Sequence, residues 1–172
     1  MTDTLGKELI LIRHAKSSWS DPSLLDWARP LNKRGKRDAP FMGKRLAQHQ
    51  CLPDLIISSP TKRTQKTIRK ICKQIAYPKK KIVISELLYT SDIHDVYRLV
   101  RSCNNKTDRL FLVGHNYVIT HFAEELTGAD IFNIPTCGIV GIRFNITAWA
   151  KVKAGEGELF FFDYPKKHTR SR

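Results

Sequence analysis

The fold is decided by the stretch Glu8–Arg13, E-L-I-L-I-R, which runs directly into His14. Its four central residues are all apolar, without the alternation of polar and apolar residues that a strand with one solvent-exposed face shows. Such a continuous run is typical of a strand covered by helices on both faces, as in a parallel sheet. Three further runs have the same character, at Leu55–Ile57, Lys81–Ser85 and Arg109–Gly114. We therefore expect these segments to pair in one sheet.

Between the runs, apolar residues recur at spacings of three and four, which predicts helices. Apolar stripes cover residues 68–75, 96–103 and 118–126, and an earlier helix is expected over about 32–48. We expect Asp92 to cap the helix over 96–103 and Gly128 to end the one over 118–126. In the earliest helix, Pro40 must either kink the chain or lie in the first turn, with Asp38 as the cap.

After Pro135 the pattern changes to two strands, Gly138–Ile146 and Glu158–Tyr164, separated by a glycine-containing turn. We expect them to form a hairpin at the sheet edge. The order of elements predicts an α/β fold, a three-layer αβα sandwich with a mostly parallel central sheet. The sequence contains no internal repeat or linker, so we expect one domain over residues 1–172 that ends in a basic, frayed tail over 165–172.

The composition excludes several classes of protein. Of 172 residues, 41% are hydrophobic and only 17 are Gly or Pro, unlike a disordered or fibrous chain. No apolar run approaches the roughly 18 residues that a membrane span needs, and Met1–Lys7 is too polar for a secretory signal. The four cysteines lack metal-site spacing, so we expect reduced thiols in a cytoplasmic protein.

The net charge is the most unusual feature of the composition, since 30 Lys and Arg face 16 Asp and Glu, giving +14. Such a charge is typical of proteins that bind nucleic acid, and equally of proteins whose substrate or partner is anionic. Composition alone does not separate these two classes.

Polar residues follow three of the predicted strands at the point where each strand ends. Arg13 and His14 lie at the end of the first strand, and Arg63 lies in the first turn of the helix after the second. His115 and Asn116 follow the fourth strand. Each of these residues alone is an ordinary surface feature. Because ligands of an open α/β sheet bind outside the carboxyl ends of its strands, their convergence indicates a functional site.

Four sequence motifs resemble a known family. R-H-A-K-S (13–17), S-S-P-T-K-R-T-Q-K-T (58–67) and V-G-H-N (113–116) are similar to the motifs of the histidine phosphatase superfamily, which has a phosphoglycerate-mutase-like fold. The stretch A-R-P-L-N-K-R-G (28–35) most resembles the SixA-type protein-histidine phosphatases. The resemblance extends from the first strand to the helix after His115, about two thirds of the chain.

The resemblance implies a reaction in which His14 attacks phosphorus and becomes phosphohistidine, for which its imidazole must be neutral. Neighbouring cations should lower the pKa of His14 and so favour that form. Arg13 and Arg63 would hold the non-bridging oxygens through charge-assisted hydrogen bonds, and His115 would donate another. No metal or cofactor is implied, and the sequence offers no carboxylate cluster that would hold a metal.

We expect four further residues to contact substrate, namely Ser17, Ser20, Arg29 and Asn116. Arg29 would attract an anionic ligand to the site. Two positions depart from the family pattern: Ala15 follows the Arg-His pair where many members have glycine, and Ser20 stands where the mutase-type motif often has asparagine.

Glu86, at the end of the third predicted strand, is the candidate general acid. An alkoxide leaving group needs a proton from such an acid. The alternative interpretation is a solvated carboxylate or a salt bridge to one of the many cations. A phosphohistidine substrate releases imidazole, which is far less basic, and so depends less on an acid.

The connections around the predicted third strand indicate the substrate. Lys62–Lys80 and Leu87–Asp108 hold little more than one helix each, which predicts an open site suited to phosphohistidine on a protein surface. A phosphomonoesterase acting on a small molecule is the alternative. A basic nucleic-acid-binding module is a third hypothesis, disfavoured because aromatic residues are only 9% and form no basic-aromatic strand pattern.

The positive charge is concentrated near the predicted site. Ten of the 30 Lys and Arg follow the first two strands: Arg13, Lys16, Arg29, Lys33, Arg34, Lys36, Arg37, Lys62, Arg63 and Lys66. We therefore interpret part of the +14 charge as a positive surface that attracts a phosphorylated partner to the site.

Overall fold

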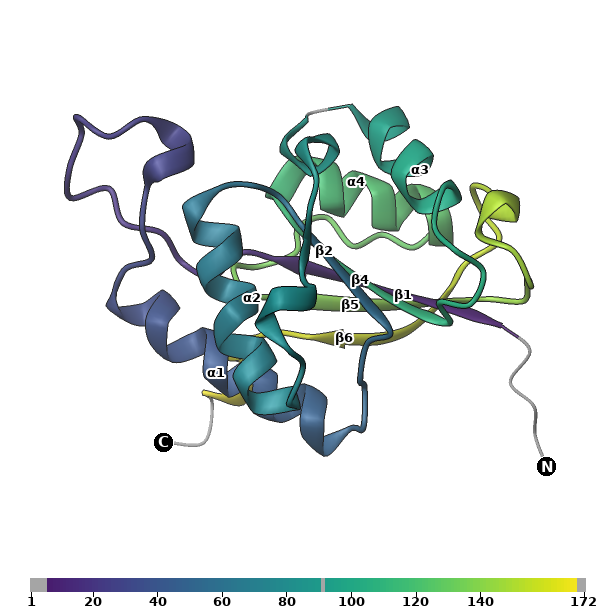
Figure 1. Cartoon of the computed structure of the whole chain (residues 1–172), viewed down its shortest axis with the longest axis horizontal. Coiled ribbons are helices and arrows are strands. Elements are labelled where there is room, and N and C mark those ends of the chain that lie inside the picture. Colours follow the sequence, from purple (N-terminus) through teal and green to yellow (C-terminus); the bar gives the residue numbers. More distant parts are fainter. Residues whose placement is uncertain (1–5, 91, 170–172) are drawn as a thin grey trace.

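A six-stranded sheet forms the centre of the computed structural model, which describes residues 6–90 and 92–169 (Figure 1). The strands are β1 (Lys7–Arg13), β2 (Leu55–Ser58), β3 (Val83–Ile84), β4 (Arg109–Gly114), β5 (Ile139–Phe144) and β6 (Glu158–Asp163), in the order β3-β2-β4-β1-β5-β6. The pairs β3–β2, β2–β4 and β4–β1 are parallel, whereas β5 runs antiparallel to both β1 and β6. The mostly parallel sheet with an antiparallel pair at one edge is thus confirmed.

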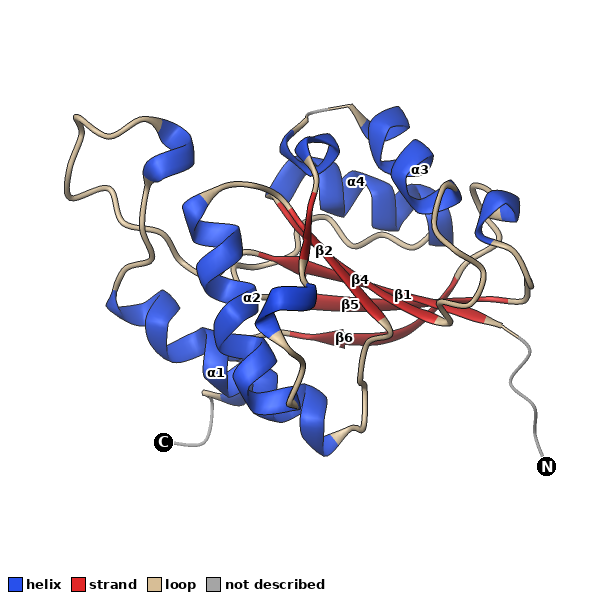
Figure 2. Ribbon diagram, viewed as in Figure 1, coloured by secondary structure: helices blue, strands red, loops and turns tan. Residues whose placement is uncertain are grey.

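Helices cover both faces of the sheet, α1 (Lys33–Gln48) and α2 (Lys62–Ile75) on one and α3 (Ile93–Arg101) and α4 (Asn116–Thr127) on the other (Figure 2). Strand β1 shows why its apolar run is continuous. Leu9 and Leu11 are buried in the core beneath α3 and α4, while Ile10 and Ile12 are buried in the core beneath α1 and α2. Successive side chains of a strand point to opposite faces, so a strand between two cores needs apolar residues at every position.

Helix α1 confirms the predicted helix over about 32–48 and shows which of the two alternatives for Pro40 holds. Asn32 is the N-cap, and its side chain accepts the backbone N–H three residues later. Asp38 lies within the helix, where it is buried and pairs with the guanidinium groups of Arg34 at 3.4 Å and Arg37 at 3.6 Å. Of the two alternatives for Pro40, a first-turn position with Asp38 as the cap is therefore wrong, because Asn32 caps the helix and the helix continues through Pro40.

The other helix ends agree with the sequence. Asp92 caps α3 by accepting the N–H of His94 at 2.8 Å, and Gly128 ends α4 with a left-handed φ of 71°. Strand β3 is shorter than expected because residues 79–81 form a 3-10 turn and Ser85 caps the next 3-10 helix.

Residues 165–168 are not a frayed tail, contrary to the prediction. They form a 3-10 helix, Pro165–His168, in which Pro165 is buried. The Nε2 atom of His168 lies 2.5 Å from Oδ1 of Asp163, and the same carboxylate accepts a bond from Arg45 of α1 at 2.8 Å. This pairing joins the end of β6 to α1. The predictions for residues 1–5 and 170–172 lie outside the described residues.

No helix in residues 6–90 and 92–169 combines the length and the apolar character needed to cross a membrane.

Gly35 allows α1 to approach the loop after β1. A Cβ atom at this position would overlap the carbonyl oxygen of Lys16, a backbone atom that cannot move aside by rotating. Lys16 also accepts the N–H of Asn32 at 3.0 Å, so the loop after His14 is fixed against the start of α1.

We expect Gly35→Ala to lower the free energy of unfolding by about 2 kcal/mol, because the methyl group overpacks this contact. Urea unfolding measures the change. Gly128→Ala is the matched control, since it meets no neighbouring atom and should cost about 1 kcal/mol through its left-handed backbone alone. A Gly35→Ala protein as stable as the wild type would contradict the close approach.

Candidate active site

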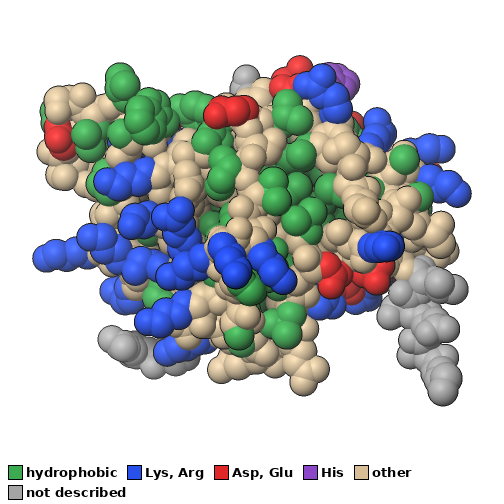
Figure 3. All heavy atoms as spheres, viewed as in Figure 1, with side chains coloured by type: hydrophobic (Ala, Val, Ile, Leu, Met, Phe, Trp, Pro, Cys, Tyr) green, Lys and Arg blue, Asp and Glu red, His purple; other side chains and the backbone are tan. Residues whose placement is uncertain are grey.

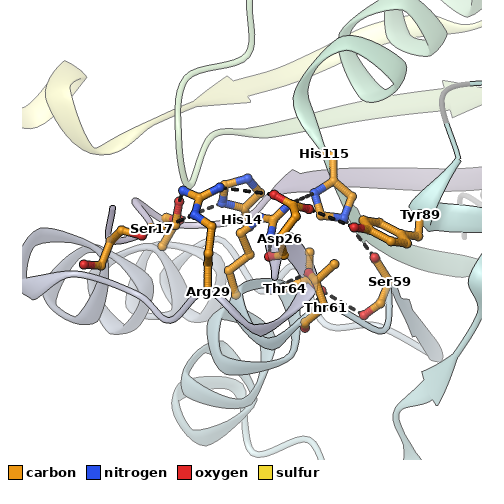
Figure 4. A network of polar contacts seen from close by, with 12 residues as sticks. His14, Ser17, Asp26, Arg29, Ser59, Thr61, Thr64, Tyr89 and His115 are labelled. Carbon is orange, nitrogen blue, oxygen red and sulfur yellow. Dashed lines mark hydrogen bonds and ion pairs between the residues drawn. The ribbon is translucent and has the colours of Figure 1, made fainter. Parts of the chain in front are cut away.

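Parallel pairing brings three strand ends together. Arg13 of β1 pairs with Gly114 of β4, and Ser58 of β2 pairs with Val113 of β4. The next residue of each chain segment therefore leaves the sheet at the same edge, as His14, Ser59 and His115. The rings of His14 and His115 lie 5.5 Å apart between centroids, and Nε2 of His115 lies 2.9 Å from the hydroxyl of Ser59 (Figure 4).

His14 is held with one ring nitrogen free. Its Nδ1 lies 2.7 Å from the carbonyl oxygen of Ala15, which can only accept, so Nδ1 carries the proton and Nε2 carries the lone pair. The N–H of Ala15 in turn donates to Oγ1 of Thr67 on α2 at 2.9 Å. His14 is nine-tenths buried. A buried imidazole fixed in this tautomer presents Nε2 as a nucleophile.

Burial lowers the pKa of His14 to about 3, assisted by the positive charge of Arg63, while the Ala15 carbonyl acts in the opposite direction. Burial and Arg63 likewise lower the pKa of His115 to about 4. Both rings are therefore neutral near pH 7.

His115 contacts both Ser59 and Arg63. Its Nδ1 lies 3.3 Å from Nη2 of Arg63, which can only donate, so Nδ1 is the acceptor. The proton of the neutral ring is then on Nε2 and is donated to the Ser59 hydroxyl at 2.9 Å. The Tyr89 ring, which is partly exposed to solvent, lies 5.5 Å from the His115 ring.

Arg63 is positioned by the start of α2. Thr61 is the N-cap and accepts the N–H of Thr64, whose hydroxyl donates to the Ser59 carbonyl at 2.8 Å. These bonds fix the turn between β2 and α2, so Arg63 in the first helical turn is directed to His115.

Both predicted phosphate-binding arginines have an unpaired donor. Arg13 donates from Nη1 to the carbonyl of Ile134 at 2.8 Å. The buried Nε atoms of Arg13 and Arg63 have no hydrogen-bond partner among the described residues, and they are the only buried side-chain nitrogens or oxygens there of which this is true. A buried unpaired donor costs about 1–3 kcal/mol, so it is unusual at two residues of one site.

Asp26 is a site residue that the sequence analysis missed. It begins a 3-10 helix, Asp26–Ala28, in the loop after β1 and lies beside His115 (Figure 4). Its carboxylate accepts bonds from Arg63 at 2.9 Å and Tyr89 at 2.8 Å, and lies 3.3 Å from Arg29. Its backbone carbonyl accepts a further bond from Arg63 at 2.7 Å. The one feature of the sequence that could have indicated Asp26 is its place three residues before Arg29, in a basic stretch.

Partial burial acts to raise the pKa of Asp26, but the hydrogen bonds from Arg63 and Tyr89 outweigh it and lower the pKa to about 2. Asp26 is thus a carboxylate near pH 7. It occupies donors that suit a phosphoryl oxygen equally well.

Arg29 and Ser17 lie together, as Nη2 of Arg29 donates to the Ser17 hydroxyl at 2.5 Å and both side chains are buried. The guanidinium also stacks 3.3 Å from the centre of the Trp19 ring. Arg29 contacts the carboxylate of Asp26, and Ser17 in turn contacts Arg29. Their roles in binding substrate stay predictions.

Three other predicted site residues form no hydrogen bond to His14 or His115 among the described residues. Ser20 is exposed and bonds only to Ser18 among the described residues. Asn116 begins α4 and accepts a bond from Thr120 of the same helix at 3.0 Å. Glu86 is exposed and, in the described part of the chain, its carboxylate has no hydrogen-bond or ion-pair partner.

Glu86 nevertheless lies near the site. It begins the 3-10 helix Glu86–Tyr89, which ends in the tyrosine that binds Asp26. The pKa of Tyr89 is raised mainly by its hydrogen bond to Asp26, with a smaller contribution from the charge of Glu86. Within residues 6–90 and 92–169, no group of three His, Cys, Asp or Glu is placed to hold a metal ion.

Comparison with known proteins shows which family the first half of the chain resembles. The sequence profile of the histidine phosphatase superfamily (branch 1) matches residues 9–88. An uncharacterized chloroplastic protein of Arabidopsis thaliana is 43% identical over 72 residues, which is 42% of this chain but only 33% of that protein. The chain thus spans about a third of this relative.

Solved structures match almost the whole fold. SixA from Agrobacterium tumefaciens has a TM-score of 0.79 at 24% identity, over 92% of this chain and 98% of that one. The protein histidine phosphatase SixA complexed with tungstate has a TM-score of 0.79 at 16% identity, over 93% and 98%. Residues 9–88 thus match the histidine phosphatase superfamily, to which the motifs showed a resemblance. The fold of the chain is SixA-like, which confirms the predicted phosphoglycerate-mutase-like α/β fold.

The lowered pKa values of His14, which is buried, and of His115, which is partly buried, make stability depend on pH. Their pKa values of about 3 and about 4 lie below the usual 6.5, so between pH 6.5 and 4 the unfolded chain binds protons that the folded protein does not. The free energy of unfolding should therefore fall as the pH falls, by up to about 1.4 kcal/mol per pH unit for each histidine.

Urea unfolding at pH 6.5, 5.5 and 4.5 tests this dependence. The variant carrying His14→Asn and His115→Asn should show a clearly shallower pH dependence than the wild type. His94→Asn, which removes an exposed histidine of α3, should keep the wild-type slope. The same slope in all three proteins would refute the effect of burial.

Proposed function

We propose that the chain is a phosphatase that removes the phosphoryl group from phosphohistidine on a protein, through a phosphohistidine intermediate at His14. The observation that carries the proposal is the neutral His14 with its Nε2 lone pair free, beside two arginines that each have an unpaired N–H. The match of residues 9–88 to the histidine phosphatase superfamily supports a phosphatase, and SixA, whose fold this chain shares, is a protein histidine phosphatase.

In the first step, Nε2 of His14 attacks phosphorus while the bond to the leaving group breaks on the opposite side. The three non-bridging oxygens carry the charge of the transition state, and Arg13 and Arg63 stabilise it with charge-assisted hydrogen bonds. His115 holds Nη2 of Arg63 through Nδ1. Its Nε2 proton reaches a phosphoryl oxygen only if that oxygen replaces the Ser59 hydroxyl as acceptor.

In the second step, water attacks the phosphorus of the phosphorylated His14 and the N–P bond breaks. The products are neutral His14 and inorganic phosphate. The positions of the donors do not change between the steps, so the same electrostatic stabilisation acts twice.

Asp26 competes with substrate for the donors. Arg63 and Tyr89 bind its carboxylate in this structure, so an arriving phosphoryl group must displace at least part of that contact. An internal carboxylate keeps the cations paired until a dianion, with more charge and more acceptor oxygens, takes its place.

A phosphohistidine substrate fits the open rim of the site. Trp19 is 72% exposed and Trp27 55% exposed in the loop that carries Asp26. The segments around β3 each contain one helix, α2 or α3, and short 3-10 turns. A phosphate on a protein surface can approach such a site. The four cysteines are free thiols, so we place the reaction in the reducing cytoplasm.

One observation favours a phosphomonoester as the second candidate substrate. The carboxyl group of Glu86 lies on the same short helix as Tyr89, and in its protonated form it would supply a proton to an alkoxide leaving group.

The intermediate can be detected directly. After a rapid quench with phosphohistidine-containing peptide or aryl phosphate, the wild type should carry acid-labile, alkali-stable phosphate, which His14→Ala should lose together with at least 1000-fold of the activity, a typical cost of removing a nucleophile. His121→Ala, which removes an exposed histidine of α4, should retain both. Absence of label and turnover in the wild type would exclude the proposed function.

The two candidate substrates are separated by Glu86→Gln. If Glu86 is the acid, kcat for a phosphoserine peptide should fall about 10²–10⁴-fold, while kcat for the phosphohistidine peptide stays within about twofold. Steady-state kinetics with both peptides measures the ratio. Equal losses with both substrates would show that Glu86 is not a general acid.

A further inference from the structure

A hollow of about 360 Å³ lies beside the candidate active site, between the loop after β1 and the first half of α2. Its apolar side includes Leu24, Trp27 and Pro60, and its other side is lined by Lys62, Lys66 and Arg69. Trp27 and Leu24 are 55% and 37% exposed, so this apolar surface is in contact with solvent. A volume of this size is sufficient for one large aliphatic or aromatic side chain.

The hollow and the phosphate donors belong to the same two segments. Trp27 follows Asp26, and Lys62 precedes Arg63. Asp26 and Arg63 are joined by two hydrogen bonds, at 2.7 Å to the backbone carbonyl and 2.9 Å to the carboxylate. A chain seated in the hollow would therefore lie against the residues that border the nucleophile.

The positive charge is gathered on this side of the sheet. Helices α1 and α2 together contain twelve Lys and Arg and a single acid, the buried Asp38. Helix α4, on the opposite face, contains Glu124 and Glu125 and no Lys or Arg. In Figure 3 the Lys and Arg side chains gather over the region that α1 and α2 occupy in Figure 1.

The cations along the hollow have no acidic partner. Among the described residues, Lys62, Lys66 and Arg69 form no ion pair, and Arg69 bonds only to the amide oxygen of Gln65 at 3.3 Å. Three unpaired cations beside an apolar concavity are complementary to a segment that presents carboxylates next to an apolar side chain.

We propose that this hollow is the docking site for an acidic segment of the phosphorylated protein, with one apolar side chain between Trp27 and Pro60 and carboxylates against Lys62, Lys66 and Arg69. The proposal rests on the proposed function and names the surface chemistry of its substrate. A nucleic acid would also pair its phosphates with the cations and could stack a base on Trp27, so its binding is one of the outcomes that the test below distinguishes.

Fluorescence anisotropy with unphosphorylated labelled peptides tests docking independently of catalysis. The probes are a 12-residue peptide with a central Leu flanked by Asp and Glu, the same peptide with Lys for the acids, and the same peptide with Ser for Leu. The wild type should bind the first at least tenfold more tightly than either of the others. The variant carrying Lys66→Glu and Arg69→Glu should lose at least tenfold of that affinity.

The matched control reverses two charges elsewhere. Lys79→Glu with Lys80→Glu changes exposed lysines in the 3-10 turn beyond the far end of α2 and should alter the affinity less than twofold. Equal binding by the two double variants, or equal binding of the Leu and Ser peptides, would overturn the proposal. A single-stranded oligonucleotide of equal charge that binds more tightly than the acidic peptide, through Lys66 and Arg69, would overturn it in favour of nucleic acid.

The same peptides carrying phosphohistidine connect docking to turnover. Reversing Lys66 and Arg69 should reduce at least tenfold the preference in kcat/KM for the acid-flanked over the lysine-flanked peptide, through KM. An unchanged preference with normal turnover would refute docking while leaving the phosphatase intact. Absence of turnover by the wild type on any phosphorylated peptide would refute the proposed function, and the anisotropy result would stand separately.

Discussion

The parallel register of β1, β4 and β2 is the constraint on which the site depends. Each strand contributes one residue beyond its last pair, and the shared register places His14, His115 and Ser59 at one edge. A shift of β1 by one residue would exchange the side chains of its two cores and move His14 away from His115. Because β1 is buried on both faces, both cores oppose such a shift. The same hydrophobic packing that stabilises the sheet therefore fixes the position of His14.

The electrostatics of the site follow from burying cations and imidazoles together. A charged histidine beside Arg63 would be destabilised by burial and by repulsion, so the site keeps its histidines neutral and its guanidinium groups charged. Asp26 supplies the compensating negative charge. It is held by contacts from three elements, Arg29 in its own loop, Arg63 on α2 and Tyr89 after β3. The site is thus balanced by an anion that belongs to the protein.

The sheet and the histidine–arginine cluster could be predicted from the sequence because both follow from local patterns. A continuous apolar run identifies a strand covered on both faces, and the rule for strand ends then places His14, Arg63 and His115 at one edge. Asp26 could not be predicted in this way. Its contact with Arg63 joins residues 37 apart through an irregular loop, and no periodicity encodes how that loop folds back over α2. The family resemblance also predicts that Ser20 contacts substrate, and in the structure Ser20 is exposed and bonds to Ser18.

Local rules also fail where two residues satisfy the same rule. Asn32 and Asp38 are both good capping residues, and burial with Arg34 and Arg37 decides that Asp38 lies within the helix. In the same way, a basic composition predicted a frayed C-terminus, whereas the ion pair of Asp163 with Arg45 and its contact with His168 hold residues 165–168 against α1.

The unequal distribution of charge between the two helical layers gives the molecule a large electric dipole moment. Helices α1 and α2 form its positive end, and α4 contributes to the negative end. In the field of an acidic surface the molecule experiences a torque before any contact forms, which turns the α1 and α2 layer toward that surface. A collision that begins in a random orientation is converted into one in which the segment carrying Asp26 and Arg63 arrives first. The α1 and α2 layer, which covers one of the two cores, thus also orients the protein toward an acidic surface during diffusion.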